Sequence, residues 1–144
     1  MKLKIDNETL AAEFFEYSHL LGIVAPVKDY HFTWLSNQRL GFQFRVNNDI
    51  EIQLLKKKRN YFFPVYEYHV PGGSTSHYLY NNQHDGEFLL PEFKHLDFLW
   101  LGKGEEVLPD EIQELVQRIR SLPQVQLVNE MTHEKIKNKT HLVF

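Results

Sequence analysis

The sequence has no cysteine among its 144 residues. Disulfide bonds, thiolate nucleophiles and thiolate-bound metal centres are therefore excluded. Long apolar segments are also missing, because the longest nearly uncharged one, Leu20 to Val27, is far shorter than the roughly 20 residues that cross a membrane. The first residues alternate charged and apolar side chains, without the apolar core of a signal peptide. We therefore expect a cytoplasmic protein that does not contact a membrane.

Familiar catalytic motifs are absent as well. The sequence contains no Gly-x-Ser-x-Gly turn, no phosphate-binding loop with its lysine and no Gly-x-Gly-x-x-Gly segment. Its eight histidines are scattered, and His133-Glu134 lacks the second histidine of a zinc-protease motif. We therefore expect no cofactor and no metal. The formal net charge of −3 does not favour a global attraction to nucleic acid, although a local basic patch is compatible with it.

What the chain does contain is enough apolar material for one core. Hydrophobic residues make up 42% of the sequence and aromatic residues 14%, far more than a disordered chain would have. A chain of this length fits one domain, and no repeat, low-complexity tract or linker divides it. Residues 1–144 are therefore expected to fold as a single domain.

Helical spacing is clearest over residues 109–120, where acidic residues follow Pro109 and arginines occupy the last turn, as the helix dipole favours. A second helix is expected over residues 26–39, opened by Pro26. Residues 1–25 are expected to be helical or irregular at first and then to form a strand. The predicted buried faces consist of Ile112, Leu115, Val116 and Ile119 in the first helix and of Val27, Tyr30, Trp34 and Leu35 in the second.

Period-two alternation predicts strands through the middle of the chain. Residues 42–46 and 50–54 alternate on either side of an asparagine-rich turn, which predicts a hairpin. A turn at 56–60 leads to a strand over 61–70, in which Pro64 indicates an edge or a bulge. Further strands are expected at 77–80, 87–90, 96–101 and 125–128, and a final helical turn at 135–139. These patterns predict an α+β fold, with a mostly antiparallel sheet of about six to seven strands and two main helices packed on one face.

The segment Leu90-Pro91-Glu92-Phe93-Lys94-His95-Leu96-Asp97-Phe98 resembles the signature of the IPExxxVDY family, and Pro91, Glu92 and Asp97 match it identically. Lys28-Asp29-Tyr30 and the closing Leu142-Val143-Phe144 are similar to other segments of that family. Its members are small bacterial proteins, chiefly of Bacteroidota, to which no reaction is assigned. The resemblance therefore implies no catalytic residue.

Asp97 is the most informative residue of this motif. On a strand over 96–101 it would lie among apolar neighbours, where an unpaired carboxylate is costly. We expect an internal hydrogen bond, and the candidate partners are backbone amides or the side chains of Arg45, Tyr30 and His95. The alternative is a functional carboxylate that acts as a general base or contacts a ligand.

Glu92 follows Pro91 between two predicted strands. A turn position with a solvated or amide-bound carboxylate is the simpler interpretation, because proline fixes the backbone there. The alternative is an acid pair of Glu92 and Asp97 at the centre of an enzyme. These two residues are the only catalytic candidates, and both are weak ones.

Lys28, Asp29 and Tyr30 occupy the first turn of the helix expected over 26–39. Asp29 suits the positive end of the helix dipole, and Tyr30 is expected at the edge of the core with its hydroxyl bonded. The alternative is an anion or partner site formed by Lys28 and the free amides of that turn.

The basic run Lys56-Lys57-Lys58-Arg59 is followed by the aromatic residues Tyr61, Phe63 and Tyr66. Basic side chains beside aromatic ones on a strand can hold phosphates while bases stack, so one hypothesis is a protein that binds single-stranded RNA. The alternative is a solvated turn whose lysines discourage edge-to-edge pairing of strands.

The leading hypothesis is a non-enzymatic protein-interaction or regulatory module. The sequence has more aromatic residues than a small core is expected to hide, so some should be exposed or covered by a partner protein or a second copy of the chain. The aromatic residues on the predicted strands are Tyr61, Phe62, Tyr66, Tyr68, Tyr78 and Tyr80.

Overall fold

The computed structural model describes residues 2–105 and 107–144, with side chains described from residue 9 onward. The predicted α+β fold is confirmed, and a six-stranded antiparallel sheet forms its centre. The strands, in spatial order, are β10 (Leu127–Met131), β1 (Ser18–Val24), β9 (Phe98–Lys103), β6 (Ser76–Asn81), β5 (Val65–His69) and β2 (Arg45–Val46).

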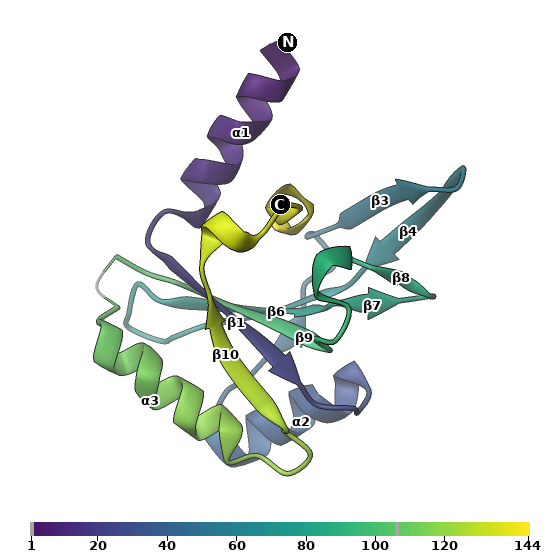
Figure 1. Ribbon diagram of the computed structural model, residues 1–144. Helices are drawn as coiled ribbons and strands as arrows, with labels where there is room; N and C mark the ends of the chain where they lie inside the picture. The colour runs from purple at the N-terminus through teal and green to yellow at the C-terminus, as the bar shows by residue number, and fades with distance from the viewer. Residues whose placement is uncertain (1, 106) are drawn as a thin grey trace.

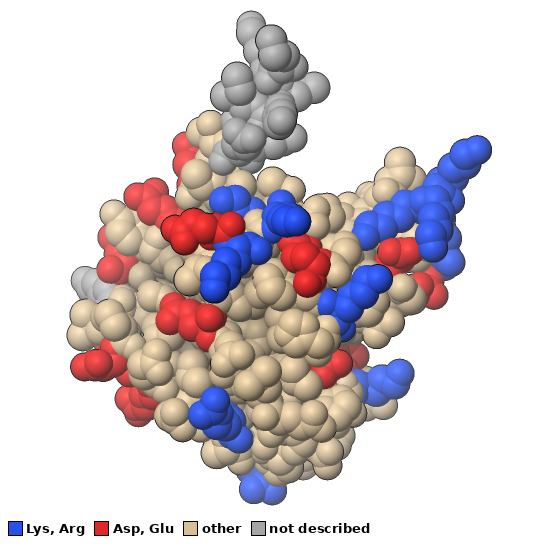
Figure 2. Space-filling view, viewed as in Figure 1, with Lys and Arg blue, Asp and Glu red and all other residues tan. Residues whose placement is uncertain are grey.

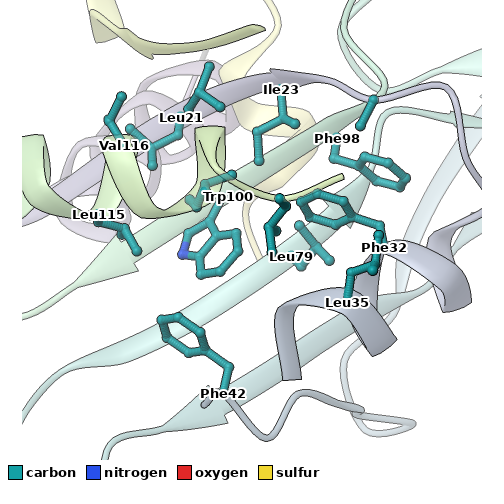
Figure 3. Close-up of a cluster of buried hydrophobic side chains, with 14 of the residues drawn as sticks. Leu21, Ile23, Phe32, Leu35, Phe42, Leu79, Phe98, Trp100, Leu115 and Val116 are labelled. Atoms are coloured by element: carbon teal, nitrogen blue, oxygen red, sulfur yellow. The ribbon is translucent and has the colours of Figure 1, made fainter. Parts of the chain in front are cut away.

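Two helices, α2 (Asp29–Leu40) and α3 (Pro109–Arg120), cover the same face of this sheet, as predicted (Figure 1). The central strand β9 buries Phe98 and Trp100 on this face (Figure 3). Phe32 of α2 stacks on Phe98, with 4.6 Å between the ring centroids. Aromatic contacts between β9 and α2 thus form the centre of this half of the core.

Several short segments cover the opposite face of the sheet. Leu99 and Leu101 of β9 point to it, because side chains alternate along a strand. The end of α1 (Lys2–Phe15), the two-stranded ribbon of β3 (Ile52–Lys56) and β4 (Arg59–Phe63), and the turn η3 (Lys139–Leu142) pack over them. Gly22 of β1 also faces this side, and an added Cβ would stand 2.7 Å from Cδ1 of Leu96. A larger residue at this position would therefore have to displace the side chain of Leu96.

The helix expected over 109–120 is confirmed as α3, with the predicted ends. Pro109 occupies its first turn, two acidic residues follow, and arginines lie in its last turn. Its buried residues are the four that were predicted, Ile112, Leu115, Val116 and Ile119.

The helix expected over 26–39 forms, but its predicted buried face is only partly right, because Leu35 is buried and Val27 packs against the core while Tyr30 and Trp34 do not. It begins at Asp29 rather than Pro26, and Gly41 ends it in the left-handed conformation, with φ 77°. The buried residues of α2 are Phe32, Thr33, Leu35 and Ser36, whereas Tyr30 and Trp34 are exposed. Both sides of this helix carry aromatic residues, and the contact between Phe32 and Phe98 decides which side is buried.

The hairpin expected between 42–46 and 50–54 is also wrong. Instead β2 pairs with β5 in the main sheet, and β3 pairs with β4 in a separate ribbon. The single strand expected over 61–70 is divided at Pro64, and its two parts belong to different sheets. Proline cannot donate to a strand ladder, which is why the chain changes sheets at this residue.

Smaller elements differ from the predictions mainly at their ends. The strand expected at 96–101 begins at Phe98, and the one expected at 125–128 begins at Leu127. The remaining short elements are β7 (Gln83–His84), β8 (Glu87–Phe88), η1 (Pro91–Phe93) and η2 (His133–Lys135). Among the described residues, no helix has the length and apolar character needed to span a membrane.

Candidate functional site

The motif segment, residues 90–98, is organised around the buried side chain of Asn82. Its carbonyl oxygen accepts a hydrogen bond from the Leu90 amide at 3.0 Å. Its amide group donates to the carbonyl oxygens of Phe93 at 3.0 Å and Leu96 at 2.9 Å. Asn82 is thus the hydrogen-bond partner of the Leu90 amide and the Leu96 carbonyl oxygen, whereas the Phe93 carbonyl oxygen also accepts a hydrogen bond from the Leu96 amide at 3.1 Å.

Asp97 lies immediately before β9 and is half-buried, rather than within a strand over 96–101 as predicted. Its carboxylate accepts a hydrogen bond from the backbone amide of Ala25 at 2.8 Å. Its own amide donates to the carbonyl oxygen of Ile23 at 2.8 Å. Among the partners considered for this carboxylate, a backbone amide is therefore the one that the structure provides. Both hydrogen bonds hold the motif segment against the end of β1.

Glu92, which follows Pro91 in η1, is bound in the same manner to a different part of the chain. Its two carboxylate oxygens accept hydrogen bonds from the backbone amide and the side-chain amide of Asn138, both at 2.8 Å. Burial alone would raise the pKa of Glu92, but hydrogen bonds from Asn138, from its own backbone and from Lys137 lower the pKa below its ordinary value. Glu92 therefore anchors the segment that leads into η3.

The acid-pair hypothesis gains no support from this geometry, because each carboxylate is occupied by a separate backbone partner. A cavity of about 240 Å³ lies beside the motif segment. Phe93, His95 and Leu96 contribute to its lining, and among the described residues neither Glu92 nor Asp97 does. An enzyme centred on the two acids would need both of them in one pocket.

Asp29 and Tyr66, two of the predicted partner-binding residues, contact each other. The Tyr66 hydroxyl donates a hydrogen bond to the Asp29 carboxylate at 2.8 Å. Burial raises the pKa of Tyr66, and the hydrogen bond and negative charge of Asp29 raise it further. This contact ties the start of α2 to β5.

The other residues of that first turn lie at the surface. Lys28 is exposed, and Tyr30, expected at the edge of the core, is 68% exposed. Trp34, one turn further along, is 56% exposed. We define the α2 outer face by the residues of this segment that are exposed together: Lys28, Tyr30, His31, Trp34, Gln38 and Arg39.

Trp34 was missed as a candidate because the sequence places apolar residues on both sides of α2. No signal within the helix shows which side is exposed, because the hydrogen bond that ties Asp29 to the sheet comes from Tyr66, 37 residues away in the sequence. On the α2 outer face the rings of His31 and Trp34 lie 6.2 Å apart, centroid to centroid. The result is an exposed aromatic surface on an otherwise well-packed helix.

The basic run lies at the turn of the β3–β4 ribbon, where Figure 2 shows blue residues gathered at the end of a projection. Lys57 and Lys58 form the turn, both in the left-handed conformation, with φ 54° and 63°. The ammonium groups of Lys56 and Lys57 lie 3.6 Å and 3.7 Å from the Glu87 carboxylate. A second acidic residue of the β7–β8 turn, Asp85, bonds Arg59.

The predicted stacking aromatics of this segment are not available. Tyr61 and Phe63 are buried against the body of the protein, and Tyr66 is half-buried and bonded to Asp29. Alternation along β4 instead leaves Phe62 exposed. Tyr61 and Tyr66, which were candidates for partner binding, thus make their contacts within the protein.

The expectation that the strands carry many exposed aromatic residues also needs correction. Tyr61 and Tyr80 are buried, and Tyr66, Tyr68 and Tyr78 are half-buried. The exposed aromatic residues lie mostly elsewhere, and those with the largest exposed fractions are Tyr17, Tyr30, Trp34 and Phe62.

A buried histidine is the second feature that sequence reasoning missed. His77 of β6 accepts a hydrogen bond at Nδ1 from Nε1 of Trp100, at 3.0 Å. Burial lowers the pKa of His77 to about 4, so the ring is neutral at neutral pH. Its neutral form is the one that can accept this hydrogen bond, which makes the pair a structural element of the core.

Among the described residues, no cluster of three or more histidine, aspartate or glutamate side chains could hold a metal ion. No family model and no curated protein matches this chain, so the resemblance of residues 90–98 to the IPExxxVDY motif stays a prediction.

Proposed function

We propose that this chain is a non-enzymatic protein-interaction module that binds a partner protein through the α2 outer face. The observation that carries the proposal is the exposure of Tyr30 and Trp34 on successive turns of one helix. Residues four apart are neighbours on a helix surface, so one partner can cover both rings. Tyrosine and tryptophan are also enriched among the few residues that dominate protein–protein binding energies.

Covering these two rings would supply a substantial part of a binding free energy. Aromatic side chains of this size bury roughly 150–250 Å² each when they are fully covered. More than half of each side chain is still exposed, so covering Tyr30 and Trp34 removes on the order of 200 Å² from water. At roughly 25 cal/mol per Å² this contributes about 5 kcal/mol, before the cost of association.

Charge and shape select the kind of partner. Lys28, His31 and Arg39 lie on the α2 outer face, while the carboxylate of Asp29 accepts a hydrogen bond from Tyr66. A positively charged, convex helix with aromatic residues at i and i+4 suits an apolar groove in another protein. The proposed partner is therefore a protein with an apolar groove bordered by acidic side chains.

A second copy of this chain is a poorer partner for the same surface. In a twofold dimer each copy presents the same patch to the other. An antiparallel pair of α2 helices would bring Lys28 of one copy towards Arg39 of its partner, and a parallel pair would bring identical cations together. Like charges across an interface oppose association, whereas acidic side chains would favour it.

Site-specific crosslinking followed by affinity measurement tests this proposal. A photo-crosslinking amino acid placed at position 34 should capture a specific protein, whereas the same group at exposed Gln117 of α3 should not. With that protein purified, Trp34→Ala should weaken binding at least tenfold and Arg39→Glu should weaken it further at low salt. Gln117→Ala is the matched control and should bind as the wild type does.

Three results would contradict the proposal. Equal crosslinking from positions 34 and 117 would show that the α2 outer face has no special role. An unchanged affinity of Trp34→Ala for the captured protein would remove the aromatic contact on which the proposal depends. Crosslinking to a second copy of the chain would show that the α2 outer face mediates self-association rather than binding to an acidic partner.

A further inference from the structure

We propose that the β3–β4 ribbon, residues 52–63, is a contact site for single-stranded nucleic acid. This site is separate from the α2 outer face, and the inference does not depend on the protein-binding proposal. It differs from the hypothesis drawn from the sequence, because the stacking residue is Phe62 rather than Tyr61, Phe63 or Tyr66.

The ribbon stands apart from the main sheet, because β3 and β4 form a two-stranded sheet of their own, from Ile52↔Phe63 to Lys56↔Arg59 (Figure 1). The two faces of the ribbon differ. Ile52, Leu54, Tyr61 and Phe63 pack against the body of the protein. Alternation therefore leaves an outer face that consists of Gln53, Leu55, Asn60 and Phe62, all of them exposed.

The chemistry of this outer face suits unpaired bases. Phe62 is 49% exposed and offers a ring on which a base can stack, and Leu55, at 71%, extends the apolar surface. The side-chain amides of Gln53 and Asn60 can donate and accept hydrogen bonds at base edges. Within residues 52–63 no carboxylate belongs to this face, although exposed Glu51 directly precedes β3. Glu87 and Asp85 pair with Lys56, Lys57 and Arg59 on the other side of the ribbon and at its turn.

The turn of the ribbon supplies cations for phosphate groups. Both central residues of the turn, Lys57 and Lys58, have positive φ, the geometry of a type I′ turn that favours Asn-Gly. Lysine is strained in this backbone conformation, so glycine or asparagine at these positions would make the fold more stable. Among the described residues Lys58 makes no ion pair, and Lys57 is 84% exposed even beside Glu87. Strained, exposed lysines at the end of a projection point to an anionic partner.

The dimensions limit how much of a strand the ribbon can contact. Lys58 and Phe62 are separated by about 13 Å along β4, at roughly 3.3 Å per residue. A short stretch of nucleic acid can therefore place phosphates at the turn and a base on Phe62. A duplex would keep its bases stacked and would not use the exposed ring, so single strands are expected to bind more tightly.

Fluorescence anisotropy with short labelled oligouridylate and oligothymidylate tests the inference. Two phosphate contacts predict a log–log salt slope of about −1.4, so the affinity should fall about sevenfold between about 50 mM and 200 mM salt. Tight binding of both oligomers identifies any single strand as the ligand, and preference for oligouridylate identifies RNA. A duplex of the same length should bind more weakly than either.

The decisive variant is the double substitution Lys57→Asn and Lys58→Gly, because it supplies the residues that the turn geometry prefers. It should unfold at the same or a higher temperature than the wild type and should lose the salt-dependent binding. Phe62→Ala should bind at least fivefold more weakly, through lost stacking. The charge-matched control, Lys135→Asn with Lys137→Asn, removes two exposed lysines elsewhere and should bind as the wild type does.

Several outcomes would overturn the inference. No binding to either oligomer at about 50 mM salt would exclude a nucleic-acid site. Equal affinity of the wild type and the turn variant for the oligomers would show that Lys57 and Lys58 do not contribute to binding. If an acidic peptide displaced the oligomers completely and Phe62→Ala bound them as tightly as the wild type does, the binding would be only a general attraction to anions. If Trp34→Ala lost binding to the oligomers, the nucleic acid would contact α2 rather than the ribbon.

Discussion

Replacing Asn82 with alanine is expected to lower the free energy of unfolding by about 4 kcal/mol. The side chain is fully buried and bonds the Leu90 amide and the carbonyl oxygens of Phe93 and Leu96. Alanine would leave the Leu90 amide and the Leu96 carbonyl oxygen unpaired, and each buried unpaired group costs about 1–3 kcal/mol. The Phe93 carbonyl oxygen would keep its hydrogen bond from the Leu96 amide. Urea denaturation at neutral pH measures the difference.

Two further variants separate lost hydrogen bonds from lost volume. Asn82→Asp keeps the size of the side chain but replaces its donor group with an oxygen that faces two carbonyl oxygens. It should therefore be at least as unstable as the alanine variant. Asn48→Ala, in an exposed turn, is the control and should change stability by less than about 0.5 kcal/mol. A destabilisation of Asn82→Ala below about 1 kcal/mol would show that water or local rearrangement satisfies these groups.

The sequence predicted α3 completely because its signals are local. A proline in the first turn, acids before arginines and four apolar residues at helical spacing all lie within 12 residues. None of these signals depends on which part of the chain packs against the helix. The α+β class followed for the same reason, since hairpins and amphipathic helices are short-range patterns.

Strand pairing could not be predicted to the same extent, because pairing joins residues far apart in the sequence. The alternating segments 42–46 and 50–54 fit a hairpin locally, yet β2 pairs with β5 and β3 pairs with β4. A prediction that treated Pro64 as the end of a strand, rather than as a bulge within one, would have separated β4 from β5. Even then, the pairing of β2 with β5 and of β3 with β4 could have been recognised only from the tertiary structure.

The candidate sites show the same limit at the level of single residues. The expected internal bond of Asp97 exists, but its partner, the Ala25 amide, lies 72 residues away in the sequence. Asn82 looks like an ordinary loop residue until the segment that surrounds it is known. Exposure of Trp34 follows from the packing of Phe32 on Phe98, which no pattern within α2 reveals.

Acidification from pH 7 to pH 5 is expected to destabilise the protein by about 2 kcal/mol through His77 alone. Burial lowers the pKa of His77 from 6.5 to about 4 in the folded protein. As the pH falls, the unfolded chain therefore takes up a proton before the folded one does. The contribution of His77 to stability is complete above about pH 6.5 and is lost as the pH falls towards 4, where the total loss reaches about 3 kcal/mol.

The hydrogen bond from the Trp100 indole gives this prediction a structural reason. Protonation of His77 at Nδ1 would remove the acceptor of the indole N–H and place a second donor there. Denaturant midpoints measured from pH 7 to pH 5 avoid most of the titration of carboxylates such as Glu92, whose pKa is lowered further by its hydrogen bonds despite its burial. His77→Gln keeps an acceptor for Trp100 but cannot take up the proton, so its stability should depend less on pH by about 2 kcal/mol across this range. His95→Gln, at an exposed position, should retain the wild-type pH dependence. If His77→Gln and the wild type instead lost equal stability, the buried ring could not be the group that binds the proton.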